Sequence, residues 1–431
     1  TATGATGLLA ITGTFFHLGF DGLCLMIGVL AGFVVMAVLL APFLRKFGAF
    51  TIPSYLGRRF ESRMVRVVAA ALLAVPMLLV LAAEVRMGAF AAALLTGRSQ
   101  GAMAGLLLLV VVVMLMAGGV RSLTWSSVAA AIAALIAFLV PVAIVAVLKG
   151  DLPLVQLGHG PLLRSIGREE AVRALEIVRA APIEFNLPSL EPMAVAKRYA
   201  MPFGEGGRVS FVLAIVMLMV GVASAPWLLP RVASAPGVYE ARKSLGWATV
   251  LFGIAMLTAT AIAVYMRSEV MELAGCRAGA LPAWVGELQT LGLLGSTPET
   301  GRIAIGDLRF ARDGIVLALP IAAGLPAALV QLAAAGGVAA AVASAGAAAV
   351  ARGNALSEDL FHGLSWETQA PGPRLVSARL FLAIAAALGG VVATTADGDP
   401  RKLVLWALAI TGASAFPVLV LSIWWKRINA Y

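Results

Sequence analysis

The chain has few of the residues that form cross-links or bind transition metals. Its 431 residues include 2 cysteines and 3 histidines, Cys24, Cys276, His17, His159 and His362, which lie far apart in the sequence. A disulfide framework or a zinc site needs several such residues at short, defined spacings. The sequence also lacks a nucleophile elbow or a glycine-rich phosphate loop in a suitable context. We therefore do not expect an enzyme, and redox or zinc chemistry is a poor interpretation.

Charged residues are also scarce, and hydrophobic residues dominate. Asp, Glu, Lys and Arg make up 13% of the chain and hydrophobic residues 61%, and the mean hydropathy is +0.96. Water alone could not solvate a folded chain of this composition, so the sequence predicts an all-α polytopic membrane protein. The net charge of +10 comes mostly from basic residues between apolar segments. Membrane topology explains that placement better than a nucleic-acid partner does.

About ten apolar segments approach the roughly 20 residues that a helix needs to cross a bilayer. We predict five spans in each half of the chain, at 1–17, 23–44, 65–95, 102–116, 123–148, 209–229, 247–266, 333–351, 376–395 and 403–425. The domains predicted from them are a first five-helix repeat (1–148), an extracytoplasmic loop (149–206) and a second five-helix repeat (207–431) with its own loop at 267–313. Within the first loop, the spacing of Val172, Leu175 and Val178 predicts a surface helix from Arg168 to Arg179.

Basic residues alternate between successive loops, which predicts the orientation of the chain in the membrane. The short loops opposite the basic ones hold little beyond Arg98, Arg401 and Lys402. The loops after the even-numbered spans hold Arg45, Lys46, Arg58, Arg59, Arg63, Arg66, Arg121, Arg231, Arg242, Lys243, Arg352, Arg374, Arg379, Lys426 and Arg427. We therefore expect both ends of this chain on the cytoplasmic side of a bacterial-type inner membrane.

The two sets of five spans fit the inverted-repeat plan of secondary transporters, in which broken helices frame a site at mid-membrane. The first span is rich in Gly and Thr, and the sixth is broken near Pro226 and Pro230. The eighth, Ala333 to Ala351, contains only Gly, Ala and Val apart from Ser344. Small residues let helices approach closely, so we expect this span to be buried. Its single hydroxyl either contacts something that crosses the membrane or bonds back to its own helix.

Four segments resemble the sodium:solute symporter family, and within it the branch of the acetate permeases. They are KFGAFTIPSYLGRRF (46–60), GGVRSLTW (118–125), APWLLPRVASAPGVYEARKSLGWA (225–248) and NALSEDLF (354–361). The resemblance covers the whole chain and implies a LeuT-like 5+5 core with broken first and sixth helices. It also implies import of small monocarboxylates such as acetate on a sodium gradient. Members of that family also have helices outside this core. We do not expect those helices within these residues.

The resemblance also implies a sodium site between the first and eighth core helices. Alignment on SEDLF puts its carbonyl ligand at Ala340 and its two hydroxyl positions at Ala343 and Ser344, and a first-helix carbonyl falls near Thr3. Sodium is a hard cation that binds several oxygens. Because Ala343 has no hydroxyl, we expect weakened sodium binding, and a proton remains an alternative coupling ion.

Two residues are candidates for the solute site. Glu84 lies within an apolar span, where an ionisable side chain is a functional-site hypothesis by default; it could carry a proton or line the solute cavity. Trp227 stands where the family has a His after the sixth-helix proline. For Arg86 we favour a position near the outer end of the same helix, in contact with water. His17 is either proton-linked or a satisfied interfacial residue.

Two functional hypotheses follow from the sequence. The first is cation-coupled symport of a small monocarboxylate by alternating access, with the solute and the lipid bilayer as partners and no nucleic acid. The alternative is a non-coupled or degenerate membrane module that acts as a solute sensor. The retained loops and the complete set of core helices favour transport, whereas the missing hydroxyl at Ala343 favours the alternative.

Overall fold

The computed structural model describes residues 4–48, 51–172, 198–203, 207–229, 232, 235–361, 371–395 and 399–429. These residues are largely helical and hold no β-strand. Eight of their helices are long and apolar enough to cross a membrane, and α8 (Gly207–Ala223) is a shorter apolar helix. The all-α membrane class is thus confirmed, while the count of ten spans is not. One of the eight stretches, Thr6–Phe47, merges the first two predicted spans, and the predicted sixth span falls on the shorter helix α8.

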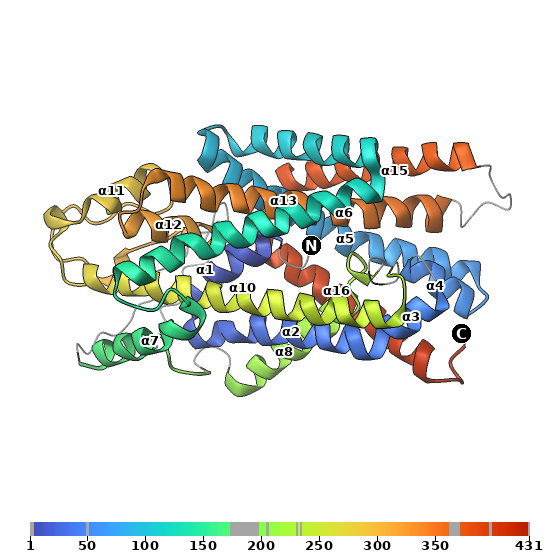
Figure 1. The fold of residues 1–431 in the computed structure, drawn as a ribbon, viewed down its shortest axis with the longest axis horizontal. Helices are drawn as coiled ribbons and strands as arrows, with labels where there is room; N and C mark the ends of the chain where they lie inside the picture. Colours follow the sequence, from blue (N-terminus) through green and yellow to red (C-terminus); the bar gives the residue numbers. More distant parts are fainter. Residues whose placement is uncertain are drawn as a thin grey trace.

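The first helix begins in the middle of the bundle (Figure 1). A π-helical turn, η1 (Thr6–Ala10), leads into α1 (Ile11–Leu18), and the short η2 (Gly19–Gly22) reverses the chain. Gly19 has a φ of 58°, which favours glycine. A Cβ there would also lie only 2.1 Å from the carbonyl oxygen of Tyr199. The chain then returns through helical segments α2 (Leu23–Val35), η3 (Met36–Leu40) and α3 (Ala41–Phe47).

The rest of the first half contains one short and two long helices. These are α4 (Ile52–Arg59), α5 (Arg63–Thr96) and α6 (Gln100–Leu148). α6 is kinked at Gly119, where φ is 55° and ψ is −144°. The kink lies at the turn that the sequence predicts between the fourth and fifth spans, and it divides α6 into two stretches that can each cross a membrane.

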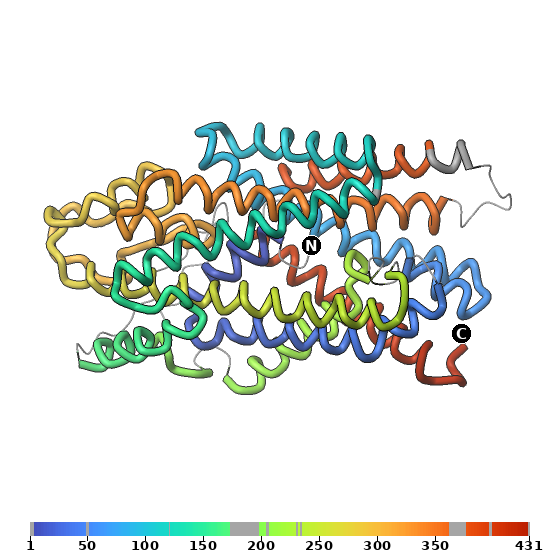
Figure 2. Tube along the Cα trace, viewed as in Figure 1, coloured from blue at the N-terminus to red at the C-terminus, as the bar shows by residue number. Residues whose placement is uncertain are grey.

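The second half repeats this pattern of long helices joined by short ones. α7 (Val155–Val172) precedes α8, and α10 (Val238–Leu273) follows it. The later elements are η4 (Ala278–Ala280), α11 (Ala283–Thr290), η5 (Ile305–Asp307), η6 (Arg312–Gly314), α12 (Ile315–Ala322), α13 (Ala327–Asn354), η7 (Ala355–Phe361), α15 (Pro371–Thr395) and α16 (Pro400–Trp424). Figure 2 shows the first and last helices, dark blue and red, meeting in the centre of the bundle.

Two predicted boundaries in the loops are wrong. The helix expected from Arg168 begins at Val155, and its predicted part beyond Val172 lies outside the described residues. The loop expected from Arg267 begins only after Leu273, because α10 continues. The second error concerns a residue that is buried: Arg267 is 2% exposed and lies 3.6 Å from Glu170 of α7. Two charges that appear solvated in the sequence are buried against each other.

α13, the helix of small residues, packs closely against its neighbours, as predicted. It contacts α5, α6, α15 and η1. A Cβ at Gly336 would lie 2.3 Å from the Cβ of Ala137 in α6, and one at Gly88 of α5 would lie 2.5 Å from the Cβ of Ala341. Neither contact leaves room for one more methyl group. The small side chains of α13 therefore let its backbone come close to those of α5 and α6.

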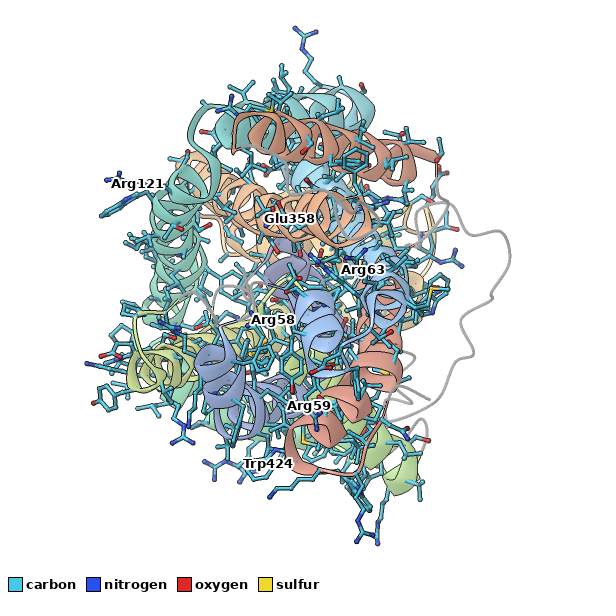
Figure 3. All side chains as sticks on the ribbon, turned by 90° about the vertical axis from the view of Figure 1, so that its right-hand side faces the viewer. Arg58, Arg59, Arg63, Arg121, Glu358 and Trp424 are labelled. Carbon is cyan, nitrogen blue, oxygen red and sulfur yellow. The ribbon has the colours of Figure 1, made fainter. Side chains whose placement is uncertain are left out.

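Several basic side chains lie together at one end of the bundle. Arg58, Arg59, Arg63 and Arg121, labelled in Figure 3, lie around the end that also carries α4. The four come from two of the loops that the sequence predicts to lie on one side of the membrane. We call this the arginine-rich end.

A buried carboxylate joins two of the family-like segments at the arginine-rich end. Asp359, in NALSEDLF, accepts a hydrogen bond from the hydroxyl of Thr51, in KFGAFTIPSYLGRRF, at 2.6 Å. It also accepts one from Nε of Arg66 at 2.8 Å. The side chain of Asp359 is 0% exposed, so these two partners replace the water that the charge has lost. They fasten α4 and α5 to the end of η7.

The kink at Gly119 gives a test of this fold. We expect Gly119→Ala to destabilise the protein by about 1 to 3 kcal/mol, because residues with a Cβ rarely adopt its backbone angles. Gly105→Ala is the matched control: it lies in α6 at an exposed helical position, and neither glycine has an atom within 4 Å of its added Cβ. There we expect no loss, or a gain of up to about 1 kcal/mol. Thermal unfolding in detergent measures both, and equal midpoints for the two variants would contradict the kink.

Candidate functional site

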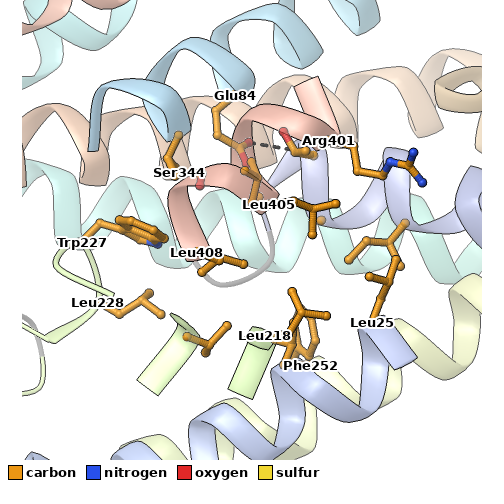
Figure 4. A pocket seen from close by; sticks show the side chains of 18 of the residues that line it. Leu25, Glu84, Leu218, Trp227, Leu228, Phe252, Ser344, Arg401, Leu405 and Leu408 are labelled. Atoms are coloured by element: carbon orange, nitrogen blue, oxygen red, sulfur yellow. Dashed lines mark hydrogen bonds between the residues drawn. The ribbon is translucent and has the colours of Figure 1, made fainter. Parts of the chain in front are cut away.

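A cavity of about 100 Å³ lies where the first helix, α5, α8, α13 and α16 meet (Figure 4). Most of its wall is aliphatic or aromatic. Among the described residues that line it, one is acidic, one is basic, and two carry hydroxyl groups. The lining consists of Gly4, Thr6, Gly7, Ile11, Leu25, Val29, Phe33, Val80, Glu84, Leu218, Val222, Trp227, Leu228, Phe252, Ser344, Arg401, Val404, Leu405 and Leu408.

The break after α8 shapes one side of the cavity. α8 ends at Ala223, and Ser224 to Leu228 form a turn. Pro226 explains the break, because proline removes a backbone donor and disfavours helix in the residue before it. Ser224 donates its hydroxyl to the carbonyl of Thr411 in α16 at 3.1 Å, which holds the end of α8 against that helix. Trp227 therefore follows the predicted break and lines the cavity.

Glu84 is the one acidic residue among the described lining residues, and its side chain lies against the first helix. The side chain comes from the middle of α5 and is 4% exposed. The backbone N–H of Thr6 lies 3.4 Å from its Oε2. A Cβ on Gly4 would lie 2.3 Å from its Oε1, so only glycine fits there. A carboxylate in such surroundings is costly to keep charged unless a proton or a cation accompanies it.

The predicted sodium ligands of α13 lie close to this carboxylate. Ser344 lines the same cavity as Glu84 and Gly4. Ala340 and Ala343 lie on the same helix and are buried, but they are not among the described lining residues. Thr3 lies outside the described residues. The structure thus brings Ser344, Glu84 and Trp227 to one cavity, while their roles stay predictions.

Two other residues considered from the sequence lie elsewhere. Arg86 is on α5, two residues beyond Glu84, and is not among the described lining residues. His17 is buried, with its ring 5.1 Å from that of Phe16. The choice between an interfacial and a proton-linked His17 stays open.

The sequence did not lead us to Arg401, which is the one basic residue among the described residues of the cavity wall. The sequence pattern places this arginine in a loop, yet α16 begins at Pro400 and Arg401 lies in its first turn. Its Nη1 donates to the hydroxyl of Thr14 in α1 at 3.3 Å. The signal available in the sequence was Asp399 followed by Pro400, a typical helix start that makes Arg401 part of the helix.

A cluster of charges fixes the position of Arg401. Asp399 accepts hydrogen bonds from both terminal nitrogens of Arg312 and, at 2.8 Å, from the backbone N–H of Arg401. Burial alone would raise the pKa of Asp399, but the hydrogen bonds and charge of Arg312, together with Arg401, hold it below its usual value. On its other side Arg312 contacts Asp313 at 2.8 Å.

The same cluster is packed against the first helix. A Cβ on Gly13 of α1 would lie only 1.8 Å from the carbonyl oxygen of Arg312. The start of α16, η6 and α1 are therefore in direct contact. This packing gives the base of Arg401 little freedom to move.

The chain is similar to several known proteins. Residues 1–154 match the model of the Sodium:solute symporter family. A protein of Cupriavidus necator named as an uncharacterized symporter is 27% identical, over 99% of this chain and 75% of its own length. A monocarboxylic acid transporter of Corynebacterium glutamicum is 24% identical, over 99% of this chain and 70% of its own length.

The fold matches that of a solved transporter. A Na⁺-coupled sialic acid symporter, in a substrate-bound outward-open state, superimposes with a TM-score of 0.69 and 15% identity, over 100% of this chain and 78% of its own. This confirms the predicted LeuT-like fold. The matched proteins are transporters rather than enzymes, and the eight candidate spans make this a multi-pass membrane protein. The family model over residues 1–154, the two relatives and the shared fold together show that the chain is similar to the sodium:solute symporter family.

Proposed function

We propose that the protein imports a small monocarboxylate together with sodium by alternating access. The match to the family model and the shared fold support sodium-coupled symport. The monocarboxylate is the further step, and the observation that carries it is the cavity itself. Its volume of about 100 Å³ and its largely apolar wall suit a short hydrocarbon chain, and one basic residue lies among the described lining residues. The name of the relative from Corynebacterium glutamicum points the same way.

The proposed ion position is between the first helix and α13. Ser344 would supply a hydroxyl oxygen, Ala340 a carbonyl, and the first helix a further carbonyl near Thr3, as in the family resemblance. Ala343 supplies no side-chain oxygen. We propose that the carboxylate of Glu84 compensates by adding negative charge beside the ion, which an uncharged set of oxygens cannot do. If the coupling ion is instead a proton, Glu84 is the group that carries it.

The proposed orientation puts the arginine-rich end in the cytoplasm of a bacterial cell, with the protein in the inner membrane. The positive-inside rule supports this orientation, because Arg58, Arg59, Arg63 and Arg121 gather at this end (Figure 3). The opposite end, which carries α7 and α11 (Figure 1), then faces outward. Solute would enter from that side and leave at the arginine-rich end.

A second candidate function is a solute sensor that keeps the fold without coupling. The specific observation in its favour is Ala343, which removes a hydroxyl from the family's ion site. Such a protein would bind the solute in the same cavity but would not accumulate it.

Uptake into proteoliposomes separates transport from sensing. The full-length natural protein should accumulate labelled propionate or pyruvate when an inward sodium gradient is applied, and should lose this accumulation when the gradient is removed. A pH gradient alone should not replace sodium. Uptake that follows the pH gradient and ignores sodium would move the coupling ion to protons, whereas no uptake under either gradient would rule out the transport proposal.

The ion position predicts opposite effects for two neighbouring residues of α13. Ser344→Ala removes an oxygen and should raise the sodium concentration for half-maximal uptake by about tenfold, which corresponds to about 1.4 kcal/mol. Ala343→Ser adds the family's oxygen and should lower that concentration. Ala347→Ser is the matched control, since Ala347 is equally buried and one turn further along; it should leave sodium dependence unchanged. If Ala343→Ser behaves like Ala347→Ser, the ion does not bind there.

Glu84→Gln tests the proposed charge beside the ion. The amide keeps the shape of the carboxylate but cannot offset a cation, so sodium activation should weaken by about tenfold or more. If Glu84 carries a proton instead, the variant should still exchange solute across the membrane but no longer accumulate it on a pH gradient. Glu299→Gln, at an exposed position, is the control. Wild-type dependence on both ions in Glu84→Gln would show that this carboxylate has no part in coupling.

A further inference from the structure

We propose that the hydroxyl of Thr6 is a ligand of the coupling sodium and takes the place of the oxygen that Ala343 lacks. This inference rests on the proposed function and names a residue that neither the sequence motifs nor the comparisons single out. The ion then has one side-chain hydroxyl from the first helix, at Thr6, and one from α13, at Ser344.

The hydroxyl of Thr6 differs from those of the other two threonines of the first helix. Thr12 donates its hydroxyl to the carbonyl of Leu8 at 2.6 Å. Thr14 likewise donates to the carbonyl of Ala10 at 2.7 Å. Thr6 is 4% exposed, and its Oγ1 is buried without a hydrogen bond of normal geometry to any described residue. Burying an unpaired hydroxyl is unfavourable, so one that its own helix does not satisfy indicates a ligand.

The carboxylate of Glu84 lies beside this hydroxyl. The backbone N–H of Thr6 is 3.4 Å from Oε2 of Glu84, and a Cβ on Gly4 would be 2.3 Å from Oε1. Oγ1 of Thr6 also lies close to the carboxylate but forms no hydrogen bond of normal geometry with it. A hydroxyl beside a carboxylate usually donates to it. Neighbouring oxygens that do not bond to each other are arranged as the ligands of a cation are, because each directs a lone pair to the ion.

The packing of the first helix against α13 places Thr6 at the depth of the predicted ligands of α13. η1 contacts α13, and a Cβ on Gly337 would lie 3.2 Å from Cδ1 of Leu9. α1 runs from the middle of the bundle to the end that carries α7 and α11, and α13 runs back from that end (Figure 1). Thr6 is three residues from Leu9 toward the middle, and Ala340 is three residues from Gly337 in the same direction. Thr6 therefore lies at about the depth of Ala340, which is one helical turn from Ser344.

The three polar side chains of this ion position meet in one cavity. Thr6, Glu84 and Ser344 are all among its described lining residues. Ala343, where the resemblance to the family places a second hydroxyl, has no side-chain oxygen. Thr6 brings the number of side-chain hydroxyls back to two, from the opposite wall. An ion held in this way joins the first helix to α13, as a coupling ion between two repeats must.

Thr6→Val tests the ligand, because valine keeps the branched shape of threonine and removes the hydroxyl. In proteoliposomes with the full-length natural protein, the sodium concentration for half-maximal uptake of labelled propionate should rise by about tenfold or more. Thr6→Ser keeps the oxygen and should stay within about twofold of the wild type. At saturating sodium, the half-saturation concentration for propionate should stay near its wild-type value, which separates a lost ion ligand from a lost solute ligand.

Thr12→Val is the matched control. It makes the same substitution at a buried threonine of the same helix, where the hydroxyl is already bonded to its own backbone. The sodium dependence of uptake should therefore stay at its wild-type value. An equal rise in Thr12→Val and Thr6→Val would show that the loss of any buried hydroxyl from this helix weakens coupling, and the assignment of Thr6 would fall.

A second experiment restores the oxygen from the other helix. Since Thr6 stands in for the missing hydroxyl, Ala343→Ser should repair Thr6→Val and return the sodium dependence close to that of the wild type. Ala343→Ser should thus gain more in Thr6→Val than in the wild type, a coupling that residues with independent roles do not show. Equal gains in both backgrounds would make Thr6 a structural residue. Ala347→Ser in Thr6→Val is the control and should repair nothing.

Sodium-dependent thermal stabilisation of the purified protein separates this inference from the proposed function. Sodium, compared with potassium, should raise the melting temperature of the wild type and of Thr12→Val more than that of Thr6→Val. If Thr6→Val does not fold, Thr6→Ala takes its place. Equal stabilisation of all three would overturn the role of Thr6 and leave sodium-coupled symport standing. If sodium neither stabilises the wild type more than potassium does nor drives uptake, the proposed function falls as well.

Discussion

Hydrocarbon cannot form hydrogen bonds, so a helix can be interrupted inside a membrane only where protein or water surrounds the break. This constraint determines where the site of this protein can lie. The π-helical turn η1 and the turn after Ala223 both interrupt regular α-helix inside the bundle. Both contribute to the wall of one cavity. The breaks and the cavity therefore depend on each other.

The composition of α13 makes this arrangement possible. A helix of larger residues could not approach α5 and α6 as closely as Gly336 and Gly88 allow. The close packing lets Ser344 reach the same cavity as Glu84 and the first helix. The hydrophobic effect gives little drive between helices in lipid, so such shape matching takes its place. The same residues that pack the bundle thus bring the polar groups of the site together.

Much of this could be predicted from the sequence, because membrane spans leave strong local signals. The kink at Gly119, the break before Pro226 and the burial of Ser344 each followed from residues in the segment itself. The pairing of Glu170 with Arg267 could not be predicted, since each residue appears solvated until the fold brings them together. Arg401 was missed for a related reason. A charged residue at the start of a helix looks like part of a loop, although its side chain can reach inward.

Two groups of described helices can be distinguished by their contacts, and α16 contacts both, through α5 and α8. α5, α6, α13 and α15 contact one another, α2 contacts α8 and α10, and α1 contacts α10. Glu84 and Ser344 belong to the first group, and the hydrogen bonds of Asp359 fasten α5 to the end of η7, which continues α13, within that group. The start of the first helix lies across from them, joined to Glu84 by the N–H of Thr6. A cation held by oxygens from both groups would keep the two groups of helices aligned while it is bound. Its departure would let one group of helices move relative to the other.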